Sequence, residues 1–192
     1  MPEKKFSGGF FSTKELAICA LFGALMFFLV FALGSEVIAL TGIPFSGGIT
    51  AMMVAFVVIT IGKDIMPRFG SAPLILIIAA TLAIPTSSWG PPGLYKVPLL
   101  FMIGLSYDIT YHLVKHSKWR AIIAGGLTGL VAMPLDYTFL VTLGLPGADK
   151  LAPLVTMFTI LYAIFGLMGS YLGDWLYEKK IKNRAFVKHL RN

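Results

Sequence analysis

The sequence predicts an all-α membrane protein with six transmembrane helices in one domain covering residues 1–192. Three observations lead to this prediction. First, 57% of the residues are apolar and only 13% are charged, whereas a soluble domain has about 25% charged residues. Second, the mean hydropathy is +0.82. Third, the apolar runs are continuous and lack the alternation of a β-barrel strand, so helices must satisfy the backbone hydrogen bonds in lipid.

The first predicted helix covers about residues 13–34. Its start is marked by Ser12-Thr13-Lys14-Glu15, which matches a capping box in which the side chains of Ser12 and Glu15 bond each other's backbone amides. A loop with several glycines and a proline follows at residues 35–48, because these residues end helices. The second helix covers about residues 49–65, and a basic turn with Lys63 and Arg68 follows it.

The third predicted helix covers about residues 71–84, with Pro73 in its first turn, where proline is tolerated. Residues 85–96 come next and contain three prolines and two glycines, which cannot continue a helix. Trp89 and Tyr95 lie in this stretch and are of the aromatic types found at membrane–water boundaries. We expect the helices to form a cup and residues 85–96 to form part of its rim.

The fourth helix is predicted at about residues 97–114, the fifth at about 119–143 with a kink at Pro134, and the sixth at about 153–177. Together the six helices form a bundle over about residues 13–177, and residues 178–192 form a basic tail. Some of these segments are short, because a bilayer core requires about 20 helical residues.

The distribution of lysine and arginine predicts the orientation in the membrane. Of the 16 basic residues, only Lys96 and Lys150 fall on one predicted side. The others occupy the N-terminal leader, the turns after the second and fourth helices, and the tail. Because cytoplasmic segments are enriched in lysine and arginine, both termini are expected to be cytoplasmic in a multi-pass protein of the cell membrane. The charge is therefore a topology signal that disfavours a nucleic-acid partner, and the tail is expected to contact anionic lipids.

The sequence contains none of the motifs that hold a common cofactor or metal. Its single cysteine, Cys19, has no partner for a disulfide, and no Cys/His spacing suits zinc. A glycine-rich phosphate loop of the G-xxxx-GK[ST] type is also missing. We therefore expect no metal and no cofactor, and any use of ATP would belong to partner proteins.

The predicted outward connections are rich in glycine, proline and aromatic residues, whereas the inward turns are short and basic. This asymmetry predicts a solute pocket that faces the outside of the cell. Acidic side chains inside spans are costly and often mark functional sites. The candidate solute-binding residues are Glu36, Trp89, Tyr95, Lys96, Asp108, Asp136, Tyr137, Thr159 and Tyr162.

We expect Trp89 and Tyr95 to stack on a ring of the solute, and Glu36 and Asp136 to accept hydrogen bonds or balance a positive charge. The carboxylates suggest an amine or a cationic heterocycle, such as a thiamine-like precursor. Lys96 could equally meet an anion, so the charge of the solute stays open.

Five of the candidates also have a structural interpretation. Asp108 could accept a hydrogen bond from a neighbouring tyrosine, and Asp136 could interrupt the helix near Pro134. Glu36 could be solvated at the interface, and the two aromatic residues of the 85–96 stretch could belong to the interfacial belt.

Small residues recur at helix-packing spacing in three of the predicted helices. Such residues let helix backbones approach closely in lipid. In the fifth and sixth helices they predict packing within the chain. In the first helix a partner protein is an equally good explanation. The residues are Ala17, Ala20 and Ala24, then Gly125, Gly126 and Gly129, then Gly166, Gly169, Ser170 and Gly173.

The chain resembles the substrate-binding S component of energy-coupling-factor (ECF) transporters for vitamins and other micronutrients. The resemblance covers about residues 12–178 and rests on length, topology, the opening Ser12-Thr13-Lys14-Glu15-Leu16-Ala17 and the pattern Ala20-xxx-Ala24. It implies a solute pocket near the outer face. It also implies that Ala20 and Ala24 dock against the transmembrane T component.

The mechanism that this resemblance implies is uptake energised by partners. The S component would bind solute from outside and associate with the T component and two ATPase subunits. It would then tip over in the membrane to release the solute. By this interpretation the chain is not itself an enzyme.

Two other classes of function stay open. The first is an intramembrane enzyme, although no His-Glu-xx-His or Gly-x-Ser motif with a suitable histidine is present. The second is a structural subunit or a small channel. A channel would require polar residues along the whole bore, whereas the predicted cytoplasmic halves of the helices are mostly apolar.

Overall fold

A computed structural model describes residues 11–41, 46–87, 89–145 and 148–184, with the side chains of residues 35, 37–50 and 150 left out. All regular structure in these ranges is helical, which confirms the predicted all-α class. The helices are α1 (Thr13–Thr41), α2 (Ser46–Ile65), α3 (Ser71–Ala83), α4 (Lys96–Leu113), α5 (Arg120–Thr142), α6 (Ala148–Leu151), η1 (Ala152–Leu154), α7 (Val155–Leu176) and η2 (Tyr177–Ile181).

Helix α1 is longer than predicted and passes through Gly34 to Thr41. The glycine suggested a helix end because glycine is the usual residue just beyond one, but the sequence continues with the apolar run Val37-Ile38-Ala39-Leu40. The helix start is as predicted. The amide of Ser12 donates to Glu15 Oε2 at 2.7 Å, and the amide of Glu15 donates to Ser12 Oγ at 3.3 Å, which is the reciprocal capping box.

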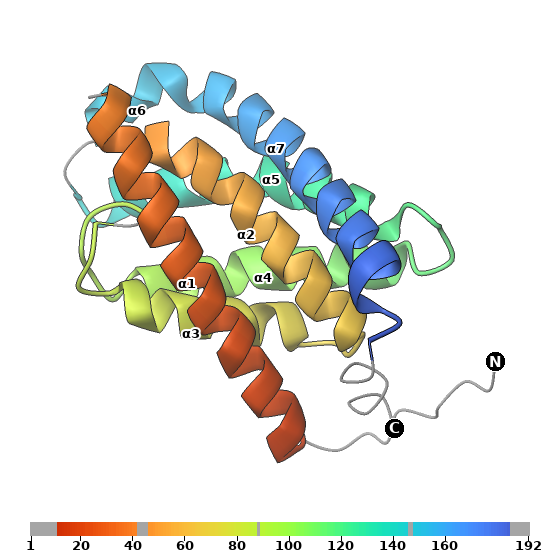
Figure 1. Cartoon of the computed structure of the whole chain (residues 1–192). Helices are drawn as coiled ribbons and strands as arrows, with labels where there is room; N and C mark the ends of the chain where they lie inside the picture. The colour runs from red at the N-terminus through yellow and green to blue at the C-terminus, as the bar shows by residue number, and fades with distance from the viewer. Residues whose placement is uncertain (1–10, 42–45, 88, 146–147, 185–192) are drawn as a thin grey trace.

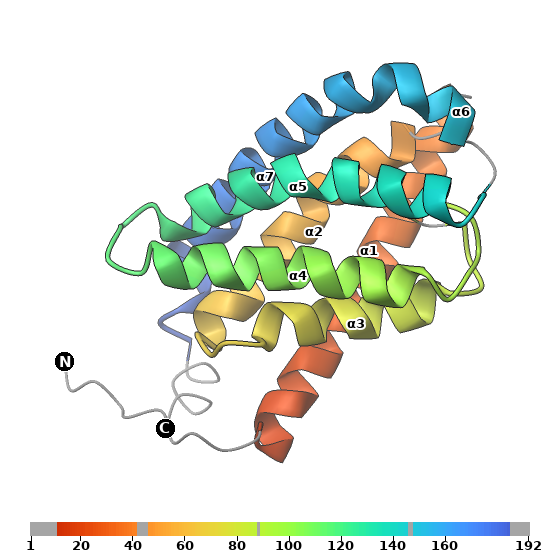
Figure 2. The ribbon, with the colours of Figure 1, turned by 180° about the vertical axis from the view of Figure 1, so that it is seen from behind.

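The six main helices form a closed ring in the order α1, α2, α7, α5, α4, α3, and each packs against its two neighbours (Figures 1 and 2). The two ends of the ring differ. One end, which we call the loop end, carries the α3–α4 connection at residues 84–95. The other, the turn end, carries the short α2–α3 and α4–α5 connections at residues 66–70 and 114–119.

Glycines bring α5 and α7 into backbone contact. A Cβ added to Gly129 would collide with the carbonyl oxygen of Tyr162, and one added to Gly125 would collide with that of Gly166. Two further glycines of α7 approach α2 in the same way, Gly169 at the Met53 carbonyl and Gly173 at the Val57 carbonyl. The small residues of these helices therefore pack within the chain, as predicted.

Among the described side chains of α1, those that are buried within the chain lie on one side of the helix. A Cβ on Gly23 would lie 2.7 Å from Cβ of Ile78 and 2.8 Å from the carbonyl oxygen of Ile75, so α1 and α3 touch there. Ala20 is exposed and Ala24 is half-buried. The outward side of α1 carries exposed large apolar side chains that include Leu21 and Phe28.

Among the described residues, three helical segments are long and apolar enough to cross a membrane, namely Thr13–Gly34 with 22 residues, Arg120–Thr142 with 23 and Ala152–Ile181 with 30. Helix α3 is apolar but only 13 residues long. Large apolar side chains are exposed on these segments, for example Leu127 and Ile160. The described part of the chain thus has transmembrane helical character. The last segment runs through η2, so the helix continues four residues into the predicted tail.

Candidate functional site

The side chain of Lys96 is fully buried at the first residue of α4. Its Nζ donates to the carbonyl oxygen of Ala83 at 2.9 Å and to that of Thr86 at 2.6 Å. Both acceptors belong to the C-terminal end of α3 and the residues just after it, and the last carbonyl groups of a helix bond to donors from outside the regular helix. Lys96 therefore fastens the end of α3 to the start of α4 at the loop end.

Tyr95 holds the loop that contains Trp89. Its hydroxyl donates to the carbonyl oxygen of Pro91 at 3.1 Å and, more weakly, to that of Trp89 at 3.4 Å. Trp89 has φ of 55°, a left-handed conformation that a side chain disfavours, and Gly90 follows with φ of 95°. A Cβ on Gly90 would lie 2.5 Å from the Tyr95 hydroxyl oxygen. The tyrosine and the glycine thus allow a strained Trp89 conformation of the kind found at functional sites.

Asp136 on α5 lies in the same region. Its Oδ1 atom is buried and has no hydrogen-bond partner among the residues that the structure describes. The carboxylate is close enough to Lys96, Tyr95 and Tyr162 to interact with each of them electrostatically. Tyr162 on α7 packs against the buried side chains of the ring. The structure therefore brings together Tyr95, Lys96, Asp136 and Tyr162, which we call the loop-end cluster.

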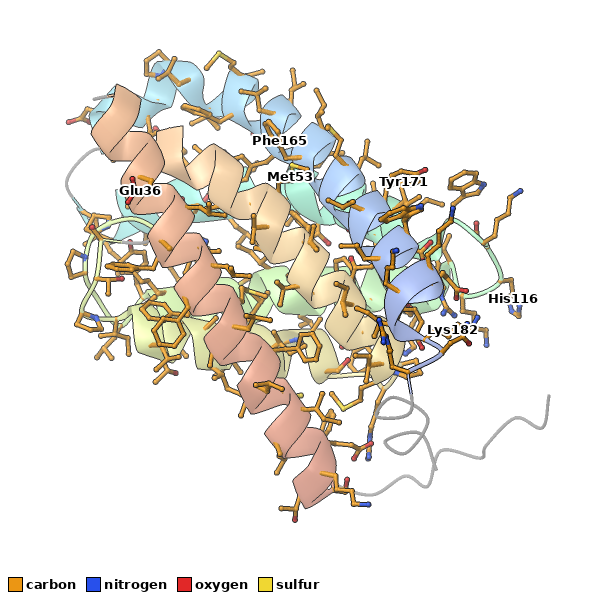
Figure 3. The ribbon with its side chains drawn as sticks, in the orientation of Figure 1. Glu36, Met53, His116, Phe165, Tyr171 and Lys182 are labelled. Atoms are coloured by element: carbon orange, nitrogen blue, oxygen red, sulfur yellow. The ribbon has the colours of Figure 1, made fainter. Side chains whose placement is uncertain are left out.

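Trp89 packs against the same hydrophobic core as Tyr95. The remaining candidates have other surroundings. Glu36 has an exposed side chain on α1 (Figure 3). Tyr137 packs against a second group of apolar side chains that includes Leu140, and Tyr162 packs against the same group. Thr159 donates to the carbonyl oxygen of Val155 in its own helix at 2.7 Å. No hydrogen bond or ion pair that we observe joins Glu36, Tyr137 or Thr159 to the loop-end cluster.

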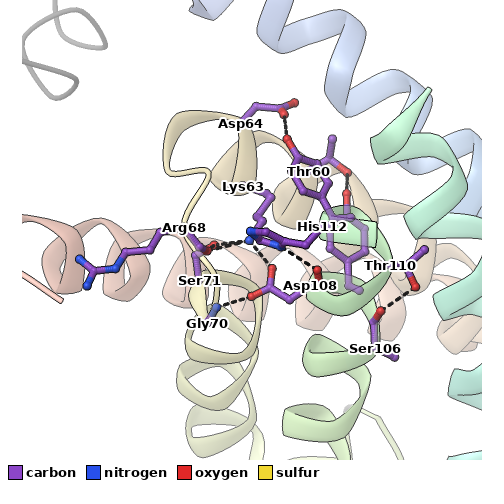
Figure 4. Close-up of polar contacts among 12 residues, drawn as sticks. Thr60, Lys63, Asp64, Arg68, Gly70, Ser71, Ser106, Asp108, Thr110 and His112 are labelled. Atoms are coloured by element: carbon purple, nitrogen blue, oxygen red, sulfur yellow. Dashed lines mark hydrogen bonds and ion pairs between the residues drawn. The ribbon is translucent and has the colours of Figure 1, made fainter. Parts of the chain in front are cut away.

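Asp108 lies apart from the other candidates, at the turn end. It is twelve residues beyond Lys96 on α4, which corresponds to about 18 Å of helical rise. Asp108 forms an ion pair with Lys63 of α2, and both side chains are fully buried. Its Oδ2 also accepts the amide of Gly70 at 2.5 Å (Figure 4). These partners differ from the neighbouring tyrosines expected from the sequence.

Two further bonds join α2 to α4 beside this ion pair. The hydroxyl groups of Thr60 and Tyr107 are 2.8 Å apart, and the Tyr111 hydroxyl donates to Asp64 Oδ1 at 2.7 Å. The three links are shown in Figure 4. We call the residues that make them the α2–α4 network, and they are Thr60, Lys63, Asp64, Tyr107, Asp108 and Tyr111.

The α2–α4 network crosses the interior of the ring, because α2 and α4 are not neighbours within it. Its members are buried, and Phe56 stacks obliquely on Tyr107 with ring centroids 6.3 Å apart. Lys63 is further satisfied by the carbonyl oxygen of Arg68 at 2.7 Å and by Ser71 Oγ at 3.2 Å. The interior at the turn end is therefore filled with side chains that bond one another, and Asp64 Oδ2 is the atom of the network left without a hydrogen-bond or ion-pair partner among the described residues.

A usable signal for this network is present in the spacing of its polar residues along the sequence. Thr60, Lys63 and Asp64 are spaced three and four residues apart and so share one face of a helix, and Tyr107, Asp108 and Tyr111 repeat the pattern on α4. Lys63 was instead counted with the charges of a cytoplasmic turn. Matching polar faces on two apolar helices would have predicted the pairing.

An apolar groove of about 400 Å³ lies at the turn end between the start of α1, α3 and α4. Its lining is almost entirely hydrocarbon, from residues such as Leu16, Phe69 and Phe101. A polar solute would find no partner there. Across the described ranges, no group of three or more His, Cys, Asp or Glu residues is arranged to hold a metal ion.

No family model matches the chain, and no curated protein or solved structure is significantly similar to it. Function is therefore inferred from the chemistry of the two ends of the ring.

Proposed function

We propose that this chain is the membrane-embedded solute-binding subunit of an ECF-type importer. In this role it captures a small water-soluble vitamin or vitamin precursor from outside. It then delivers the solute together with a transmembrane T component and two ATPase subunits. The observation that carries the proposal is the buried Oδ1 atom of Asp136, which lacks a partner among the described residues and lies near Lys96, Tyr95 and Tyr162.

The proposed topology has α1, α2, α3, α4, α5 and α7 as six spans of a multi-pass protein in the cell membrane. Both termini and the turn end lie in the cytoplasm, and the loop end lies outside. The lysine and arginine distribution supports this orientation, because Lys96 and Lys150 are the only basic residues assigned to the loop end. The loop-end cluster then faces the medium that supplies the solute.

The filled turn end supports a binding protein over a channel. A channel needs a polar path through the whole ring, whereas the α2–α4 network occupies the interior with buried, mutually bonded side chains. An intramembrane enzyme is the other competing function. An enzyme would convert the solute to a product, whereas a binding subunit releases its solute unchanged.

The test is to purify the chain and identify the small molecules that it retains by mass spectrometry. We expect one solute at a stoichiometry near one per chain, recovered without chemical change after incubation with the protein. Asp136→Ala and Trp89→Ala are each expected to weaken its binding while the protein stays folded. A preparation that retains no solute, or that converts it, would contradict the proposal.

A further inference from the structure

The two ionisable side chains of the loop-end cluster differ in how well they are satisfied. Lys96 is fully buried, and its ammonium group already donates to the carbonyl oxygens of Ala83 and Thr86. Asp136 has a buried carboxylate oxygen without a partner among the described residues. Lys96 therefore has a structural role, because it joins the end of α3 to the start of α4. Asp136 is the residue whose carboxylate still lacks a hydrogen-bond donor.

A buried acceptor without a hydrogen bond costs about 1–3 kcal/mol, and more when it is charged. Lys96 offsets only part of this cost, because the two charges attract each other but no direct ion pair joins Lys96 to Asp136. The hydroxyl of Tyr95 is directed to the loop carbonyls of Pro91 and Trp89. A bound molecule with a hydrogen-bond donor would satisfy Asp136.

Aromatic rings accompany this carboxylate. Tyr95 and Tyr162 are both near enough to Asp136 for an electrostatic interaction. The face of an aromatic ring attracts a cation, and the attraction grows when water is excluded. A buried carboxylate oxygen without a partner, with Tyr95 and Tyr162 within electrostatic reach, is thus suited to a positively charged nitrogen group, whereas the carboxylate of Asp136 would repel an anion.

We infer that the solute is a small organic cation, an amine, an amidine or a cationic nitrogen heterocycle, whose charged group binds the carboxylate of Asp136. This inference rests on the proposed function, and it decides the charge that the sequence left open. In this inference Lys96 does not bind the solute. It positions the site by holding α3 and α4 together.

The experiment measures the charge of the retained solute. Small molecules are released from purified wild-type protein with methanol and identified by mass spectrometry. They are then separated at pH 7 on sulfonate cation-exchange and quaternary-ammonium anion-exchange resins. We expect the solute to bind the cation-exchange resin. This readout uses wild-type protein alone, so it does not depend on whether a variant folds.

The purified solute fraction is then titrated onto Asp136→Asn and onto a matched control, Asp149→Asn. Both changes remove one carboxylate on the same side, but Asp149 is exposed on α6. Loss of a charge-assisted hydrogen bond predicts at least about tenfold weaker binding for Asp136→Asn. The control is expected to bind as wild type does, and both should keep the wild-type melting temperature without solute to within a few degrees.

The outcomes separate the two proposals. A solute that binds the anion-exchange resin or neither resin would overturn the inference and leave the proposed function intact. A cationic solute that binds Asp136→Asn as tightly as wild type would do the same. If wild-type protein retains no solute at all, the proposed function fails, and the inference fails with it.

Discussion

Lys63 and Asp108 form an ion pair between α2 and α4 in which neither side chain is exposed to solvent. The pair crosses the interior of the helical ring rather than joining neighbouring helices. It is satisfied on both sides, because Lys63 also donates to Arg68 and Ser71, and Asp108 also accepts the Gly70 amide. A buried charge that is so completely bonded is stable only while its partner is present.

Removing one member of this pair is expected to destabilise the protein strongly. Lys63→Met or Asp108→Leu leaves an uncompensated buried charge, which costs about 3–5 kcal/mol. The double variant Lys63→Met/Asp108→Leu removes both charges and is expected to recover most of that loss. Thermal unfolding of the purified variants measures the effect.

A surface pair provides the control for this prediction. Lys182 and Glu178 form an exposed i,i+4 ion pair at 2.8 Å, so Glu178→Gln should change stability by less than about 1 kcal/mol. If either single variant of the buried pair were as stable as Glu178→Gln, the Lys63–Asp108 ion pair would not stabilise the protein as predicted.

Gly129 is expected to tolerate no larger residue, because its Cα faces the backbone of Tyr162 and Ala163 across the α5–α7 contact. Gly129→Val should separate the two helices and cost at least about 1–3 kcal/mol. Leu127→Val on the same helix changes an exposed side chain and should unfold at nearly the wild-type temperature. Equal melting temperatures for the two variants would show that the helices do not touch at Gly129.

The left-handed backbone of Trp89 predicts an unusual order of stability. Trp89→Gly is expected to be about 1 kcal/mol more stable than Trp89→Ala, because glycine adopts φ of 55° without the cost paid by a residue with a Cβ. Both variants lose the same packing of the indole ring. At the exposed Leu94 of the same loop, where φ is not positive, the alanine variant should be at least as stable as the glycine variant. An alanine preference at both positions would contradict the strained conformation.

Ala20→Trp is expected to block assembly with the proposed T component and ATPase subunits while solute binding stays at the wild-type level. Ala20 is exposed on α1, so a larger side chain there should not disturb the ring. Gly23→Trp is the contrasting variant, because its side chain would collide with Ile78 and should impair folding itself. Co-purification of the partners measures assembly. Unchanged recovery of partners with Ala20→Trp would remove α1 as the docking surface.

The parts of the fold that follow from local sequence rules were predictable. The Ser12–Glu15 capping box, the helix-breaking 85–96 stretch and the apolar helices all depend on residues close in the chain. The end of α1 was not predictable in the same way, because Gly34 is a weak stop signal when an apolar run follows it. The helix continues there in spite of the glycine.

Contacts between distant segments were the least predictable. The position of Asp136 beside Tyr95, Lys96 and Tyr162 depends on how α4, α5 and α7 are arranged in the ring, although all four residues were named as candidates. The pairing of Lys63 with Asp108 was missed because a lysine near a helix end resembles an orientation signal. The spacing of the polar residues on α2 and α4 carries a signal for the pairing, and the fold shows that this lysine points into the interior.

The central claim is that solute enters at the loop end, which faces outside. The most direct measurement is binding of the purified solute to right-side-out and inside-out membrane vesicles from cells that express the chain. The orientation of the vesicles is checked by labelling with a membrane-impermeant maleimide. Ser87→Cys places a thiol at an exposed position of the loop end, and Lys115→Cys places one at an exposed position of the turn end. The native Cys19 is fully buried and should not react. We predict that only right-side-out vesicles bind solute and that only Ser87→Cys is labelled in them. Solute binding confined to inside-out vesicles, or maleimide labelling of Lys115→Cys in right-side-out vesicles, would contradict the account.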